Sequence, residues 1–190
     1  MKRALILVLV ALVALLVSVA RREYLGLRND LTAQREAVTN QWSNVNEALR
    51  QRAALVPGMV DAVQRFAPGE TAVLRETAGA VAQLAGAAAP PARILANRRL
   101  DTAIARLLLV AENYPKLRSD AAFLRLQDDL ADSENRIAVE RRKYNEALQR
   151  YNTSISLFPG NIVAGISGMA RDDAYFQTEP GAHAAPQARI

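Results

Sequence analysis

A seven-residue apolar repeat constrains the fold of this chain more than any other sequence feature. Large apolar residues recur at that interval over residues 123–158: Phe123, Leu130, Ile137, Tyr144, Tyr151 and Phe158. An α-helix turns once every 3.6 residues, so these side chains line one face of a single helix about 55–60 Å long. Ser119 or Asp120 is expected to cap its start. Because a helix with one apolar face is not stable alone in water, this helix must pack against others.

Residues 23–118 supply the other helices. A similar stripe begins at Tyr24 and runs to Leu55, where Pro57-Gly58 is expected to break or kink the helix. A second helix is predicted from Pro57 to about Ala89, with an irregularity at Pro68-Gly69 and an end at Pro90-Pro91.

The third helix is predicted from about Ala92 to Asn113, where Tyr114-Pro115 stops it. The predicted fold class is therefore all-α: an antiparallel up-down four-helix bundle over residues 23–158, with an N-terminal transmembrane helix in residues 1–22. Glycine and proline are frequent after Phe158, so residues 159–190 are expected to be an irregular tail. The alternative is a kinked but continuous helix through Pro57, which would give a three-element hairpin with a longer first arm.

The N-terminus is apolar enough to meet a lipid bilayer. Ala4–Ala20 contains no charge and one polar side chain, Ser18, and it follows Met1-Lys2-Arg3. As a helix it measures about 25 Å, at the short end of a bilayer span. One interpretation is a signal peptide cleaved after Ala20, because Ser18-Val19-Ala20 has a small-x-small pattern. An uncleaved anchor is favoured, since Arg21 and Arg22 suit the interface that flanks a span.

Basic residues on the two sides of this run are nearly balanced. A short basic N-terminus tends to stay in the cytoplasm, which favours placing the bulk of the protein outside it. Arg21, Arg22 and Arg28 are suited to contact anionic lipid headgroups.

Composition excludes several classes of chemistry. The 190 residues include no cysteine and one histidine, His183, so disulfides, cysteine-ligated metals and histidine-based metal clusters are excluded. The 24 Lys and Arg residues exceed the 19 Asp and Glu residues, for a net charge of +5. Since these charges are interleaved and form no basic stripe with stacking aromatics, nucleic-acid binding is not expected.

Glu134 is the carboxylate of greatest interest, because it lies at the edge of the apolar stripe. An inter-helix ion pair with Arg52, Arg98 or Arg141 is the favoured interpretation. A metal site using Glu112 or Glu134 is the alternative. We therefore expect no cofactor and no catalytic residues.

Four short motifs punctuate the last predicted helix and its end: Glu134-Asn135, Tyr144-Asn145, Tyr151-Asn152 and Phe158-Pro159. The two Tyr-Asn pairs lie seven residues apart, so both tyrosines fall on the apolar stripe and both asparagines lie one step round the helix. A buried tyrosine ring leaves a hydroxyl that needs a hydrogen-bond partner. These residues are predicted to have a structural role or to form a partner surface.

Together with Trp42, Leu55-Val56-Pro57 and Glu112-Asn113-Tyr114-Pro115, these motifs resemble the LemA family over nearly the whole chain. The resemblance implies a bacterial, single-pass, membrane-anchored four-helix bundle. It supplies no catalytic residues.

The predicted function is a membrane-tethered helical scaffold or interaction protein of the bacterial cell envelope. Its expected partners are the bilayer of the inner membrane, through Ala4–Ala20, and an envelope protein. Assembly into a homo-oligomer is also compatible with the sequence. Two alternatives stand beside it: a metal-dependent enzyme that uses bundle carboxylates, and a secreted soluble bundle after cleavage at Ala20.

Overall fold

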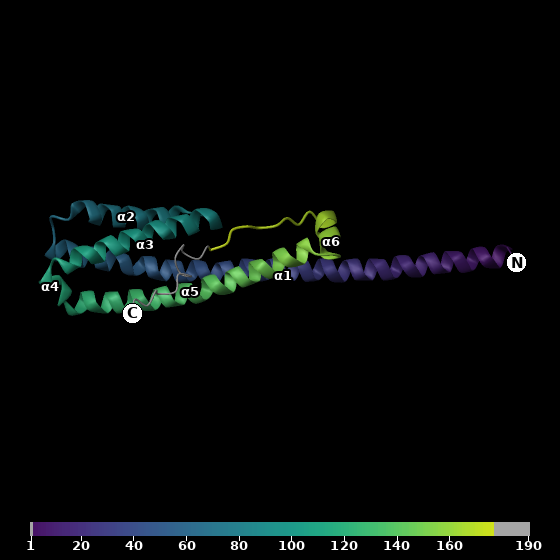
Figure 1. Cartoon of the computed structure of the whole chain (residues 1–190), viewed down its shortest axis with the longest axis horizontal. Coiled ribbons are helices and arrows are strands. Elements are labelled where there is room, and N and C mark those ends of the chain that lie inside the picture. The colour runs from purple at the N-terminus through teal and green to yellow at the C-terminus, as the bar shows by residue number, and fades with distance from the viewer. Residues whose placement is uncertain (1, 177–190) are drawn as a thin grey trace, which may run out of the picture. The chain divides into compact units, whose positions relative to one another are not determined.

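A computed structural model describes residues 2–176 of the chain, with side chains from residue 6 onward. Every regular element in that range is an α-helix (Figure 1). The helices are α1 (Lys2–Phe66), α2 (Thr71–Gly86), α3 (Pro90–Glu112), α4 (Pro115–Arg118), α5 (Ala121–Ser156) and α6 (Gly160–Ser167). The predicted all-α class is confirmed, and α1, α2, α3 and α5 are the long helices. Residues 177–190 of the expected tail lie outside the described residues.

α1 continues through Pro57, so the predicted helix break at this proline is wrong. Val56, Met59 and Val63 are fully buried on either side of it, in one core cluster. A proline inside a helix costs about 3 kcal/mol. Each buried side chain of this size contributes about 1.5–3 kcal/mol, so packing outweighs that cost. The alternative of a continuous helix is the one observed, and α1 ends only at Phe66, before Pro68-Gly69.

The other helix boundaries follow local sequence signals. Pro90 and Pro115 each stand in the first turn of a helix, where the missing N–H has no helical partner to lose. Asp120 caps α5: its Oδ1 accepts hydrogen bonds from the backbone N–H of Ala122 at 3.1 Å and of Phe123 at 2.9 Å. The predicted cap at this position is confirmed.

None of the helices, within the residues that the structure describes, offers an apolar stretch long enough to cross a membrane. The side chains of Ala4 and Leu5, the first two residues of the predicted anchor Ala4–Ala20, lie outside the described residues.

The chain divides into two compact units. The first, called unit 1, comprises residues 1–40 and 146–173. The second, called unit 2, comprises residues 41–145 and 174–190.

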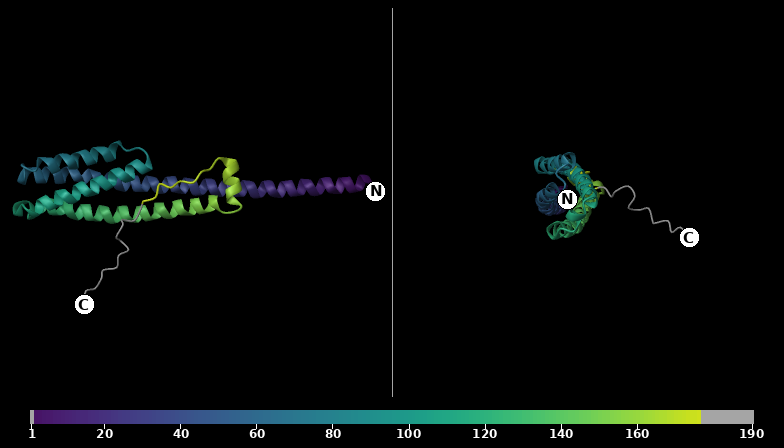
Figure 2. Two further views of the ribbon diagram at one scale, coloured as in Figure 1. Left: turned by 45° about the horizontal axis from the view of Figure 1, so that its top comes forward. Right: turned by 90° about the vertical axis from the view of Figure 1, so that its left-hand side faces the viewer.

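Unit 2 contains the larger core. α2 and α3 lie side by side there (Figures 1 and 2). Fully buried leucines, Leu100, Leu107 and Leu117, join Phe123 and Met59 in this core. α2 and α3, of about four and six turns, each bury one apolar face, as the bundle prediction requires.

Unit 1 has a smaller core in which α6 packs. Leu31 of α1, Tyr151 and Ile155 of α5, and Val163 and Ala164 of α6 form this cluster. α6 stands across the end of α5 (Figures 1 and 2). This short helix corrects the expectation that residues from 159 onward are irregular. Gly168, at φ 66°, ends it in the left-handed conformation that glycine adopts without strain.

Gly160 is expected to be irreplaceable at the turn between α5 and α6. A Cβ added at this position would lie 2.1 Å from the backbone oxygen of Ser154, so Gly160→Ala must displace the main chain. We expect it to lower the free energy of unfolding by about 1–3 kcal/mol, as measured by urea denaturation. Gly165→Ala, on the same helix, is the control because no atom lies within 4 Å of its added Cβ. Equal effects of the two substitutions would contradict this account of the turn.

Candidate functional site

Asn145, in the first Tyr-Asn motif, binds the backbone of Phe176 with both ends of its amide. Its Nδ2 donates to the Phe176 carbonyl oxygen at 2.7 Å, and its Oδ1 accepts from the Phe176 N–H at 3.0 Å. These two bonds satisfy both backbone hydrogen-bonding groups of Phe176, as pairing with a neighbouring β-strand would. Both groups belong to unit 2.

An aromatic cluster holds the Phe176 side chain beside this contact. The ring centroids of Trp42 and Tyr144 are 5.3 Å apart, and Phe176 lies 6.1 Å from Trp42 and 5.8 Å from Tyr144. The Arg141 guanidinium lies 5.2 Å from the Phe176 ring centroid. Aromatic pairs at these distances contribute about 0.5–1.5 kcal/mol beyond the burial of their area. Phe176 is thus held through its ring and through its backbone.

Asn152, in the second Tyr-Asn motif, makes an equivalent contact inside unit 1. Its Nδ2 donates to the Asp172 carbonyl oxygen at 2.6 Å, and its Oδ1 accepts from the Asp172 N–H at 3.1 Å. The Tyr151 hydroxyl donates to the Ala170 carbonyl oxygen at 3.0 Å, which is the hydrogen-bond partner predicted for a buried tyrosine. We call the Asn145–Phe176 and Asn152–Asp172 contacts the two tail clamps.

The tail clamps explain the residue types in the motif. An asparagine amide carries both a donor and an acceptor, so it can pair with the N–H and the C=O of one residue, whereas aspartate and serine cannot do both in the same way. The spacing of the motifs was visible in the sequence. Their targets were not, because they lie 31 and 20 residues further along the chain.

A second cluster of polar residues lies in unit 2, around Arg52. This arginine is 5% exposed and forms ion pairs with Asp101 of α3 and with Glu134 of α5, the latter at 2.9 Å. Asn97 Nδ2 donates to Asp101 Oδ2 at 2.9 Å, and Arg141 Nη2 lies 3.8 Å from the same oxygen. Glu134 was predicted to pair with Arg52, Arg98 or Arg141; the ion pair is confirmed, and its partner is Arg52. We call this group the Arg52 cluster.

Asp101 was not predicted from the sequence as a member of the Arg52 cluster. Its position four residues after Asn97 was the available signal, because residues with this spacing meet on one face of a helix. The Arg52 cluster contains two arginines and two carboxylates, so its formal charges balance, and its ion pairs join α1, α3 and α5.

The remaining motif residues lie at the surface. Asn135, Phe158 and Pro159 are exposed, and so is Glu112, the other carboxylate considered for a metal site. No group of three or more possible metal ligands occurs in the part of the chain that the structure describes.

A shallow groove lies between α2 and α3. It has a volume of about 370 Å³ and is lined by Arg75, Glu76, Gln83, Arg99 and Thr102, among others. Arg106 Nη1 contacts Glu76 Oε1 at 2.7 Å, and Arg99 Nη1 donates to Gln83 Oε1 at 3.0 Å. Glu76 and Gln83 of α2 are therefore each paired with an arginine of α3.

Two ionisable groups have shifted pKa values. Burial lowers the pKa of Arg93, and the positive charge of Arg50 adds to the effect; the Arg93 guanidinium donates to the Ala87 carbonyl oxygen at 2.9 Å. Burial also raises the pKa of Tyr114. Its hydroxyl donates to Glu70 Oε1 at 3.2 Å, which stabilises the neutral phenol, and the Glu70 charge acts in the same direction.

The Tyr114 contact predicts a pH dependence of stability. The pKa of Tyr114 is higher in the folded chain than its unfolded value of about 10, so the contribution is complete below that pH and is lost as pH rises above it. We expect the urea midpoint of the wild-type chain to fall more steeply than that of Tyr114→Phe between about pH 9.5 and 11. Parallel profiles for the two proteins would show that the phenol is not linked to folding.

The fold and these contacts define an all-helical protein whose C-terminal segment is held by asparagine clamps on a long helix. The sequence profile of the LemA family matches residues 41–189, and the chain belongs to that family. This result confirms the resemblance drawn from the motifs.

Curated relatives are similar over part of the chain. Magnetosome protein MamQ 2 of Paramagnetospirillum magneticum is 38% identical over 78 residues, which cover 41% of this chain and 28% of the relative. Magnetosome protein MamQ of Magnetospirillum gryphiswaldense is 31% identical over 103 residues, covering 54% of this chain and 38% of the relative. The chain therefore matches well under half the length of these relatives.

Proposed function

We propose that this protein is a helical scaffold tethered to a bacterial membrane by the N-terminal part of α1. One observation carries the proposal. The large apolar side chains from Ile6 to Val19 are each 51–70% exposed, in an unbroken run on one helix. A contiguous apolar surface of this size is rare on a protein surrounded by water. A bilayer removes it from water, and each buried CH₂ group then contributes about 0.8 kcal/mol.

The proposed tether is a single-pass anchor over Ala4–Ala20 in the inner membrane. Arg21 and Arg22 follow the run directly and suit the lipid headgroup layer. A short basic N-terminus favours the cytoplasmic side for residues 1–3, with the bulk of the protein outside the cytoplasm. The relatives named as magnetosome proteins support a place on a membrane-bounded structure of bacteria.

A scaffold role follows from the chemistry of the described residues. The Arg52 cluster and both tail clamps pair their polar groups with other parts of the same chain. They act as parts of a rigid support. The partner surface is proposed to lie on the exposed side of α5 around Asn135 and on the tail segment that the two tail clamps bind.

Flotation with lipid vesicles tests the tether. The full chain is mixed with vesicles and centrifuged through a density gradient in 1 M NaCl, which screens surface electrostatic attraction. The wild-type chain is expected to float with the vesicles. A variant with Leu9→Gln, Val13→Gln and Leu16→Gln is expected to stay at the bottom. Equal distribution of the two chains would overturn the tether.

Site-specific photocrosslinking tests the partner surface. A photoreactive amino acid at Asn135 on α5 is expected to yield a discrete protein adduct in intact cells. The same group at Ala78, an exposed position on α2, is the matched control. The partner proposal fails if both positions give the same background of adducts.

A further inference from the structure

We propose that α6 and the turn before it lie in the headgroup layer of the membrane that receives the N-terminal run of α1. The inference rests on the proposed tether and adds a second contact with lipid. In this proposal, the surface of α6 and the turn before it contacts the bilayer interface rather than another protein. All of the residues involved belong to unit 1.

The first observation is that α6 and the turn before it expose an apolar surface to solvent. Phe158 is 78% exposed and Ile166 is 68% exposed, and Leu157 and Ile162 are exposed beside them in the chain. The opposite face of α6, with Gly160, Val163 and Ala164, is buried in the unit 1 core. α6 therefore has two apolar faces, of which the protein covers only one.

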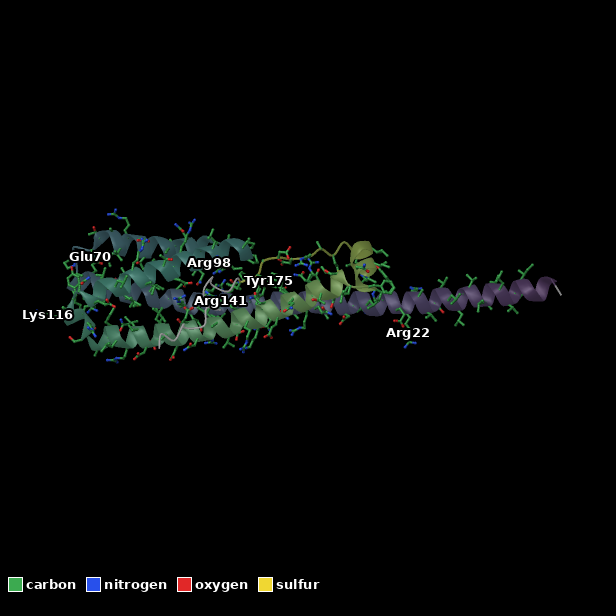
Figure 3. All side chains as sticks on the ribbon, viewed as in Figure 1. Arg22, Glu70, Arg98, Lys116, Arg141 and Tyr175 are labelled. Carbon is green, nitrogen blue, oxygen red and sulfur yellow. The ribbon has the colours of Figure 1, made fainter. Side chains whose placement is uncertain are left out.

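The second observation is the position of this surface along α1. The Tyr24 hydroxyl lies 3.3 Å from the Ser167 hydroxyl, so the end of α6 contacts α1 at that residue. Tyr24 is four residues beyond Ala20, which corresponds to about 6 Å along a helix. The headgroup region adds about 5–8 Å on each side of the hydrocarbon core, so the Tyr24 contact falls within it when the span ends at Ala20. Figure 3 shows Arg22 on α1 just beyond α6, on its N-terminal side.

The third observation is the distribution of charge. No charged residue occurs between Tyr151 and Ala170, the segment that includes the turn and the whole of α6. On α1, the exposed charged residues around the Tyr24 contact are Arg21, Arg22, Glu23 and Arg28, which together carry a net positive charge. Uncharged apolar residues beside arginines are the combination that an anionic lipid surface attracts.

The absence of cysteine from the chain makes a direct depth measurement possible. Single variants Leu12→Cys, Ile162→Cys and Gln149→Cys are labelled with a nitroxide in the full chain, in vesicles of phosphatidylcholine and phosphatidylglycerol. The accessibility of each label to oxygen is compared with its accessibility to a water-soluble nickel complex. Ile162 and Gln149 are both exposed in unit 1, so neither change should disturb the core.

The oxygen-to-nickel ratio at position 162 is expected to exceed that at position 149 by several-fold. A low ratio at 162 with a high ratio at 12 would overturn this inference and leave the tether in place; the surface of α6 would then face water or a protein. Low ratios at both positions would overturn the tether as well.

Discussion

Replacement of Arg52 by alanine is expected to lower the free energy of unfolding by about 1.5–3 kcal/mol. Arg52 is buried, and its guanidinium is the shared partner of Asp101 and Glu134. Removing it leaves Glu134 without the cation that it pairs with, and leaves Asp101 with the more distant Arg141, at 3.8 Å, and the Asn97 amide. The loss is greater than that of an exposed ion pair because the Arg52 side chain is 7% exposed, although those of Asp101 and Glu134 are 32% and 45% exposed.

Arg106→Ala is the matched control for this prediction. Arg106 also forms an ion pair with a glutamate, Glu76, but the two side chains are 56% and 42% exposed. Water and salt screen such a pair, so its removal is expected to cost less than about 1 kcal/mol. Both costs are measured by urea denaturation of the full chain. Similar losses for Arg52→Ala and Arg106→Ala would contradict the assignment of Arg52 as the centre of a buried network.

Loss of either tail clamp is expected to free the backbone that it binds. In Asn145→Ala, the N–H and C=O of Phe176 lose their partners; in Asn152→Ala, those of Asp172 do. Each hydrogen bond contributes about 0.5–1.5 kcal/mol, so two bonds correspond to an increase of about 5- to 150-fold in local opening. Hydrogen exchange of the Asp172 and Phe176 amides measures this opening directly.

Two further variants separate the clamp from a general effect on α5. Asn135→Ala changes an exposed asparagine of the same helix and is expected to leave both amides protected. Asn145→Asp keeps an acceptor for the Phe176 N–H but removes the donor to its carbonyl, so an intermediate exchange rate is expected. The clamp assignment is wrong if Asn145→Ala and Asn135→Ala exchange alike.

Local signals in the sequence predicted much of the fold. The seven-residue stripe located α5, Asp120 caps it as expected, and Pro90 and Pro115 follow the ends of α2 and α3, as predicted. Pro57 misled the prediction because its effect depends on tertiary packing: the burial of Val56 and Met59 keeps α1 continuous. α6 was missed because its eight residues are too few for a periodic pattern.

The sequence indicated which residues form the candidate site, but it did not indicate which residues they contact. The paired Tyr-Asn motifs indicated buried rings and polar groups that need partners, and Glu134 indicated an arginine partner. The targets of the asparagines and the role of Asp101 depend on contacts between segments far apart in sequence, which periodicity does not encode. Family membership adds no chemistry to these residues, so their role comes from the contacts themselves.

Mass spectrometry of the N-terminus of the protein, separated into membrane and soluble fractions of its cells, tests the tether most directly. The account predicts that the protein is recovered from the membrane fraction and that its N-terminal peptide still contains the apolar run before Arg21. Recovery from the soluble fraction, with a chain that begins at Arg21, would contradict it. That result would mean that Ala4–Ala20 is a signal peptide and that the remaining bundle is released.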